Sequence, residues 1–262
     1  MSGRIACLLV IEASPGALVF LLLAGLFAGA VNAVAGGESL LVFPALLAVG
    51  FPPLAANVTN SVAQWPGYLG QVVGSREELR GQRRRMLLTS VAGIAGSAIG
   101  CALLLVLPGA VFDAVVPALV LLASAVLALQ PRIKRWIGTP EPGAPDRLPA
   151  LLTAVFLAAI YGGYFGGALG VILIDALPLC AHDRLVPLNA LKGLLSLLVA
   201  TVTVVIFAVG APVDWTAVAL LAPSTLVGGF LGAKIARRLP ENVLRWCVVG
   251  LGVAVGLYLL FR

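Results

Sequence analysis

Two sets of polar side chains recur at the same spacing in an otherwise apolar chain. The first polar stripe is Asn57, Asn60 and Gln64, and the second polar stripe, 132 residues further on, is Asn189, Lys192 and Ser196. Residues at i, i+3 and i+7 project from one face of a helix. Amides and hydroxyls donate hydrogen bonds and an ammonium adds positive charge, so stripes that face each other are suited to binding a small anion. Alternatively, these side chains only bond across packed helices.

Lys192 is the one basic residue that lies deep inside a long apolar run. A charge at the centre of a bilayer costs about 2.5–3.5 kcal/mol on insertion scales, so the ammonium requires a partner or a water-filled cavity. One interpretation is a cation that neutralises a bound anion. The other is an ion pair with Asp175, because both residues are equidistant from Asp183–Arg184, where a hairpin would bring them to one depth.

Glycine-rich segments precede two short apolar pieces, residues 39–50 and 171–181. The two segments are Gly36–Ser39 and Gly166–Gly170. A helix beginning at such a segment would aim free N–H groups and its positive dipole end into the protein, which suits an oxyanion, and Ser39 is a candidate N-cap. The glycines are equally consistent with sharp turns alone. Glu38 would compete with an anion at this point, so it is protonated, acts as a proton carrier, or faces an aqueous vestibule.

The elements that must position these residues are membrane helices. The chain is 61% hydrophobic and 11% charged, with a mean hydropathy of +1.08. Near-continuous apolar runs cover residues 17–35, 86–107, 114–129, 150–169, 194–209, 215–233 and 246–261. Such runs approach the length that crosses a bilayer core of about 30 Å. We therefore predict an all-α polytopic membrane protein, whose first apolar run is a span and not a cleaved signal peptide.

The polar stretch 131–149 contains five prolines and separates two similar halves. Gly96 and Pro108 recur at the same offset as Gly228 and Pro240. This predicts a first membrane repeat, a Pro-rich linker and a second membrane repeat, spanning residues 1–130, 131–149 and 150–262. Each repeat would contain about five membrane elements, one of them short and broken or re-entrant. Glycines four apart, such as Gly25/Gly29 and Gly96/Gly100, indicate close helix packing and no more.

The charges of the loops predict that the two repeats are inverted. Loop 75–85 contains five arginines, whereas its counterpart 210–216 contains no basic residue. Because Lys and Arg are retained in cytoplasmic loops, equivalent loops should face opposite sides of the membrane. We expect loop 75–85 and the linker to be cytoplasmic, in a plasma or inner membrane.

Other classes of function are disfavoured by the same residues. The basic residues cluster between spans with Trp136 as the one aromatic side chain among them, which is unlike a nucleic-acid interface. A single histidine, His182, builds no histidine-based metal site, and four scattered cysteines form no C-x-x-C motif. We find no P-loop and no nucleophile–base pair, so we expect no cofactor, no nucleotide-driven pump and no enzyme.

The chain resembles the sulfite exporter TauE/SafE family of permeases. The resemblance rests on AGAVNAVAGGESLL, P-x-L-L-x-x-G-x-P-P, ANVTNSVA and the Pro66-Gly67 pair in the first half, and on YGGYFGGALGVIL, LNALKGLLS and GGFLGAKIARRLP in the second. It implies a multi-spanning transporter of sulfur-containing anions such as sulfite and organosulfonates. Glu38 stands where the family pattern usually has glycine, and Asp175 interrupts a segment that is ordinarily apolar. Both departures lie near the expected site, so the substrate could differ from the usual one.

Together these observations predict a secondary transporter of a small anion, sulfite or an organosulfonate, working by alternating access. The expected substrate-binding residues are Asn32, Ser39, Asn57, Asn60, Gln64, Asn189, Lys192 and Ser196. Glu38 and Asp175 are candidates for proton coupling, although the coupling ion could be H⁺ or Na⁺. Expected partners are the substrate, membrane lipids and a second copy of the chain. A cation transporter using Glu38 and Asp175, a membrane assembly factor and an intramembrane enzyme at His182 remain the alternatives.

Overall fold

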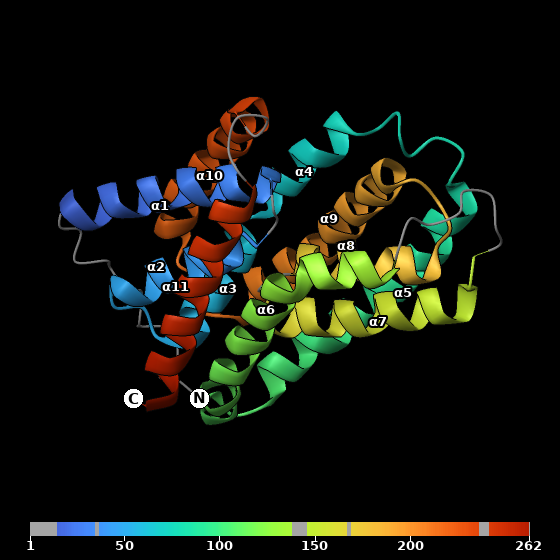
Figure 1. Ribbon diagram of the computed structural model, residues 1–262. Helices are drawn as coiled ribbons and strands as arrows, with labels where there is room; N and C mark the ends of the chain where they lie inside the picture. The colour runs from blue at the N-terminus through green and yellow to red at the C-terminus, as the bar shows by residue number, and fades with distance from the viewer. Residues whose placement is uncertain (1–14, 35–36, 138–145, 167–168, 236–240, 262) are drawn as a thin grey trace.

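The computed structural model describes residues 15–34, 37–137, 146–166, 169–235 and 241–261 (Figure 1). Within these ranges the regular secondary structure is helical. The helices are α1 (Pro15–Val34), α2 (Ser39–Ala48), α3 (Pro53–Ala63), α4 (Trp65–Gly74), α5 (Arg83–Val106), α6 (Gly109–Ile137), α7 (Leu148–Tyr164), α8 (Leu169–Cys180), α9 (Leu185–Gly210), α10 (Trp215–Ile235) and α11 (Glu241–Phe261).

The helices fall into long and short classes, as the apolar runs predict. Four helices of the described chain, α1, α5, α6 and α9, are long and apolar enough to cross a membrane. Helices α7, α10 and α11 carry shorter apolar stretches. Large apolar side chains such as Leu23, Val91 and Phe230 are more than half exposed, which suits contact with lipid. The protein is an all-α polytopic membrane protein.

Three helix pairs form the frame of the bundle: α1 packs along α10, α5 along α7, and α6 along α11 (Figure 1). Glycine makes the first two contacts possible. A Cβ atom at Gly29 would collide with the carbonyl of Thr225, and one at Gly100 would collide with the carbonyl of Ile160. The close packing predicted from the glycine pairs is confirmed, and it joins helices from different halves of the sequence.

The two short apolar pieces are short helices, α2 with 10 residues and α8 with 12. They start at Ser39 and Leu169, next to the glycine-rich segments from which helix starts were predicted. Residues 35–36 and 167–168 lie outside the described residues. Helices α2 and α8 belong to opposite halves, and each packs against the helix that precedes it.

The helix that carries the first polar stripe is interrupted at its third member. Helix α3 ends at Ala63 and α4 starts at Trp65, so Gln64 lies at the junction. Proline explains the interruption, because Pro66 has no N–H for the carbonyl of Val62 and its ring crowds that turn. The amide of Gln64 therefore projects from a break between two helices.

The predicted linker is shorter than its composition indicates. Helix α6 continues through Pro131 to Ile137, and α7 begins at Leu148. Both ends of the stretch 131–149 are thus helical, and residues 138–145 lie outside the described part of the chain. A polar, proline-containing segment can still extend a helix beyond the membrane, since water hydrates its surface.

Candidate functional site

Gln64 is the centre of a buried hydrogen-bond network. Its Nε2 donates to Ser39 Oγ at 2.6 Å and to Asn60 Oδ1 at 2.7 Å. The hydroxyl of Tyr68 donates to Gln64 Oε1 at 2.9 Å. All four side chains are buried. The break at Pro66 thus leaves an amide whose two N–H groups and carbonyl oxygen are all paired with side chains of the first half.

This network reaches across to the second half of the sequence. Ser39 Oγ donates to the carbonyl of Gly166 at 2.8 Å, and Asn57 Nδ2 donates to the carbonyl of Tyr164 at 3.0 Å. Tyr164 ends α7, and Gly166 lies between α7 and α8. We refer to Ser39, Asn57, Asn60, Gln64 and Tyr68 together as the central network. The Ser39–Gly166 bond brings the two glycine-rich segments into contact.

The prediction that Ser39 caps α2 is wrong. Glu38 occupies the N-cap position without a side-chain capping bond, and Ser39 is the first residue of the helix. Its hydroxyl is engaged by Gly166 and Gln64 instead. A hydroxyl that donates to a carbonyl of the other half holds two segments together, whereas a cap would have stabilised only its own helix.

A small cavity of about 20 Å³ adjoins the central network. It is lined by Ser61, Gln64, Tyr68, Gly162, Gly166, Leu169, Ser196, Val199, Ala200 and Thr203. This volume accommodates about one water molecule. The hydroxyl of Ser196 has no hydrogen-bond partner among the described protein groups, so it is available to a molecule in the cavity. The cavity thus carries a few polar groups in a mainly apolar wall, and its space is far smaller than a four-atom oxyanion needs.

Sequence reasoning missed three residues of this cavity, Ser61, Tyr68 and Thr203. A signal was present for two of them. Tyr68 follows Gln64 by four positions and Thr203 follows Ser196 by seven, so each extends a polar stripe along the same helical face. Hydroxyls in an apolar run are common, which is why spacing alone did not single them out.

Lys192 is buried on α9 and extends toward the start of α8. Its Nζ would lie 3.8 Å from a Cβ atom at Gly170, in the first turn of α8. Ser196, one turn further along α9, lines the small cavity. The predicted cation is therefore placed beside the second glycine-rich segment. Asp175 is buried on α8, which packs against α9, and neither Asp175 nor Lys192 lacks a partner. Their mutual ion pair stays a prediction.

Two of the eight predicted substrate-binding residues, Asn189 and Asn32, are not buried in the described structure. The side chain of Asn189 is exposed, although Lys192 and Ser196 are buried. It lies in the first turns of α9, close to the helix end, where neighbouring helices leave it uncovered. Asn32, near the end of α1, is half-buried. The second polar stripe is thus divided, because equal spacing sets the direction of a side chain and not its depth.

Glu38 is buried with only 2 % of its surface exposed. Thr225 on α10 hydrogen-bonds to its carboxyl group, and Oε2 would lie 3.9 Å from a Cβ atom at Gly67, in the first turn of α4. The other oxygen, Oε1, has no hydrogen-bond partner among the described groups. The positive end of a helix dipole stabilises a carboxylate placed in this way. Glu38 borders the central network through Ser39 but does not line the small cavity, so it leaves that space free for an anion.

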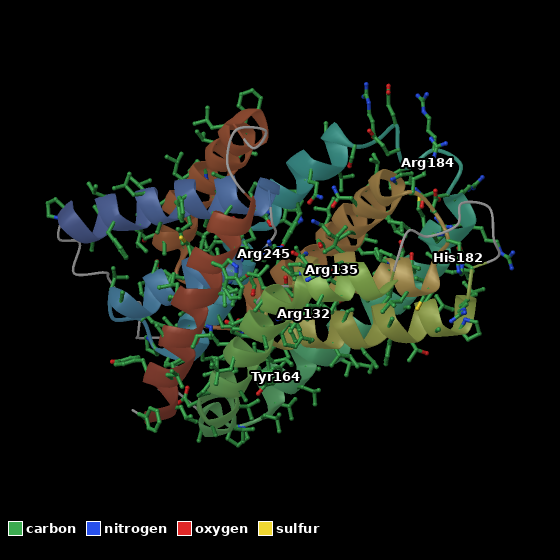
Figure 2. All side chains as sticks on the ribbon, in the orientation of Figure 1. Arg132, Arg135, Tyr164, His182, Arg184 and Arg245 are labelled. Carbon is green, nitrogen blue, oxygen red and sulfur yellow. The ribbon has the colours of Figure 1, made fainter. Side chains whose placement is uncertain are left out.

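Arg245, at the start of α11, is a second buried basic residue, with 4 % of its surface exposed (Figure 2). The sequence did not single it out, because the apolar run begins only at residue 246. One turn further along α11, Val248 lies next to Gly37, which precedes α2. Arg245 therefore belongs to a helix that flanks the first glycine-rich segment.

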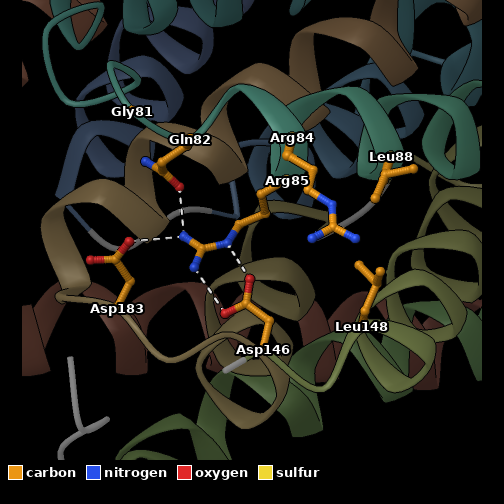
Figure 3. Close-up of a pocket in the computed structure, with 8 residues that line it drawn as sticks. All are labelled: Gly81, Gln82, Arg84, Arg85, Leu88, Asp146, Leu148 and Asp183. Carbon is orange, nitrogen blue, oxygen red and sulfur yellow. Dashed lines mark hydrogen bonds and ion pairs between the residues drawn. The ribbon is translucent and has the colours of Figure 1, made fainter. Parts of the chain in front are cut away.

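A charged cluster lies at one end of the bundle, near His182 and Arg184 (Figures 2 and 3). Arg85 Nε and Nη2 donate to the two oxygens of Asp146 at 2.8 and 2.9 Å, and Nη1 donates to Asp183 at 2.8 Å. We call Arg85, Asp146 and Asp183 the Arg85 cluster. It borders a cavity of about 460 Å³. Burial opposes ionisation of Asp146, but bonds from Arg85 and from the His182 N–H outweigh it and lower the pKa of that carboxyl.

Comparisons with known proteins agree with this architecture. Residues 21–259 match the family model described as sulfite exporter TauE/SafE. A probable membrane transporter protein of Haemophilus influenzae is 26% identical over 239 residues, covering 88% of this chain and 90% of that protein. The probable membrane transporter protein YfcA of Escherichia coli K12 is 29% identical over 245 residues, covering 86% of this chain and 81% of that protein. A probable membrane transporter protein of Sinorhizobium, ORF9, is 27% identical over 58% of each chain.

Proposed function

Because this chain belongs to the sulfite exporter TauE/SafE family, it is a multi-pass membrane transporter, and we propose that it carries a small sulfur oxyanion or an organosulfonate. The relatives are named as transporters and not as enzymes. The finer proposal covers the substrate, the residues that bind it and the way in which access alternates.

The observation that carries the proposal is the bond from Gln64 through Ser39 to Gly166. It gathers amide and hydroxyl groups at the starts of the two short helices α2 and α8, next to the small cavity. Lys192 supplies a positive charge nearby. Charge-assisted hydrogen bonds contribute about 1.5–3 kcal/mol and neutral ones about 1 kcal/mol, so one ammonium with several neutral donors can select an oxyanion.

The size of the small cavity supports the proposal of alternating access. About 20 Å³ holds a water molecule, so a substrate enters only when the surrounding helices move apart. The packing supports inverted repeats as the basis of that movement. In the repeat, α1 corresponds to α7, α2 to α8, α3 to α9 and α5 to α10. The contact of α1 with α10 therefore corresponds to that of α7 with α5, and the contact of α2 with α3 corresponds to that of α8 with α9.

Coupling to a proton is the role we propose for Glu38, with Asp175 as the second candidate. Both carboxyl groups are buried, and Glu38 is adjacent in sequence to a member of the central network. A proton gained or lost there would alter the charge beside the binding site. Na⁺ is the alternative coupling ion. The basic loop 75–85 and the linker are proposed to be cytoplasmic, in the inner or plasma membrane.

A thermal-shift screen of purified protein tests the proposal, because a ligand that binds only the folded state raises its stability. Sulfite, sulfate, thiosulfate, taurine and isethionate are each added as the sodium salt at one sodium concentration. Sodium chloride is the control. We expect at least one sulfur anion to stabilise the wild type and Gln71→Ala, but not Gln64→Ala. Gln71 is a matched control, since it lies on α4 and packs on Gly193 away from the network.

Two results would contradict the proposal. Stabilisation by none of the anions would remove the substrate class. Equal stabilisation of Gln64→Ala and Gln71→Ala would move the site away from the central network. A response to the cation alone would instead favour a cation transporter that uses Glu38 and Asp175.

A further inference from the structure

The Arg85 cluster joins the two halves of the chain at one end of the bundle. Arg85 is in the first turn of α5, whereas Asp146 directly precedes the N-cap of α7 and Asp183 lies between α8 and α9. The backbone N–H groups of His182 and Arg184 also donate to these two carboxylates, at 3.1 and 2.7 Å. One guanidinium therefore holds together three segments that are far apart in sequence.

An apolar layer separates the Arg85 cluster from the small cavity. It is formed by buried side chains of α7, α8 and α9, with Met86 and Ala92 of α5 packed against them. Leu169 and Val199 belong both to this layer and to the wall of the cavity. A substrate leaving the cavity in this direction must pass between these helices. Helix α5 must then separate from α7 or α9, which requires Arg85 to release its carboxylate partners.

In the second repeat, the segment before α10 corresponds to the segment before α5, and it is held by weaker bonds. Gln82 precedes α5, and Asp214, 132 residues later, precedes α10. There the N–H of Asp214 donates to Thr59 Oγ1 at 3.0 Å, and the carboxylate of Asp214 accepts the N–H of Ala217 at 2.8 Å. These bonds involve backbone groups and a hydroxyl. Of these two positions in the described chain, the one at Arg85 has the charge-assisted, bidentate contact between halves.

The cluster is also positioned to open. The side chains of Arg85, Asp146 and Asp183 are 14%, 21% and 28% exposed, and they border the cavity of about 460 Å³. Water can therefore replace the ion pairs when they separate, so opening avoids the penalty of leaving buried charges unpaired.

We propose that the Arg85 cluster is the gate that closes one end of the transport path, with Arg85 as the residue whose bonds break at each opening. The inference rests on the proposed transport function. Because the gate lies on the side of loop 75–85, it is the cytoplasmic gate in the proposed orientation. Loss of the Arg85 bonds should populate a conformation in which the apolar layer is open to water from that side.

Two native cysteines report on this opening. Cys180 ends α8 with 9 % of its surface exposed, and its carbonyl accepts the N–H of Arg147. Cys101 is fully buried in α5, far along that helix from Arg85. We would prepare two forms of the full chain that retain either Cys180 or Cys101, with the other three cysteines changed to serine. Each is reconstituted in liposomes and labelled with a maleimide, and the labelling rate is measured.

Arg85→Gln is expected to raise the labelling rate of Cys180 by about tenfold or more, which corresponds to about 1.4 kcal/mol in the opening equilibrium. The rate at Cys101 should stay at its wild-type value. Arg84→Gln is the matched control, because Arg84 lines the same cavity but points toward Leu88 and Leu148 and binds neither carboxylate (Figure 3). Arg84→Gln should leave both rates unchanged.

An unchanged rate at Cys180 in Arg85→Gln would overturn the gate. Equal acceleration at Cys180 and Cys101 would also overturn it, since that result means general loosening of the fold. If Arg85→Gln does not fold, Asp183→Asn leaves the bidentate Asp146 pair in place and should give a smaller, still selective, acceleration at Cys180. Labelling needs no substrate, so the gate is tested separately from the thermal-shift screen, and either proposal can fail alone.

Discussion

Replacing Gln64 with leucine should lower the free energy of unfolding by about 2 kcal/mol. The change removes three side-chain hydrogen bonds, to Ser39, Asn60 and Tyr68. Buried donors and acceptors left unpaired cost about 1–3 kcal/mol each in soluble proteins. Side-chain hydrogen bonds within membrane helices average nearer ~0.6 kcal/mol, because the unfolded chain in the membrane also finds partners. Three bonds at that value give the expected total, and leucine is close enough in size that little cavity energy is added.

Reversible unfolding in mixed detergent micelles measures this difference. Helix content followed by circular dichroism gives the unfolding midpoint. Gln71→Leu is the control, since it makes the same glutamine-to-leucine change at another position, on α4. A difference between the two variants below about 0.5 kcal/mol, the usual effect of an uninvolved surface change, would refute the network as a source of stability.

Three further outcomes are expected. Lys192→Gln should weaken anion binding, measured by calorimetry, by roughly ten- to a hundredfold, and Lys192→Arg should not restore it fully, because a planar fork does not replace a compact ammonium; unchanged affinity would place the cation outside the site. Reporter fusions at residues 80, 140 and 239 should all report the cytoplasm and one at 212 the opposite side; agreement between 80 and 212 would exclude inverted repeats. The lowered pKa of Asp146 means that its stabilising contribution is complete above about pH 4 and disappears as pH falls through the lower folded-state value. The thermal midpoints of wild type and Asp146→Asn should therefore differ at pH 7 and converge under strong acid, and a difference that persists there would show that Asp146 acts by packing alone.

Hydrophobic runs and glycine spacing were sufficient to predict membrane helices and their close packing, but not which helices pair. A membrane span is a property of composition over about 20 residues, so it can be predicted without knowledge of tertiary contacts. The interruption at Gln64 could also have been read from Pro66, since proline blocks the preceding turn. It was missed because proline inside a membrane helix is often tolerated.

The burial of individual side chains and their interaction partners could not be predicted from the sequence. Asn189 and Lys192 share a helical face, yet only Lys192 is covered by neighbouring helices. Arg85 is one of five arginines in loop 75–85, and nothing in the run distinguishes it from Arg84. Its importance arises from Asp146 and Asp183, which are 61 and 98 residues away. Periodicity reports the direction of a side chain, whereas burial and pairing depend on which helices come together.

The glycine contacts of α1 with α10 and of α5 with α7 have a consequence for biosynthesis. Residues 35–214 are made between α1 and α10, so the groove at Gly29 faces lipid until most of the chain has been inserted. Neither half contains its own principal helix partners. A ribosome that stops within the second half would therefore release a chain whose small-residue faces are unmatched, and membrane quality control should treat it as an orphan subunit. Helix α1 therefore reaches its final packing late, once α10 has been inserted.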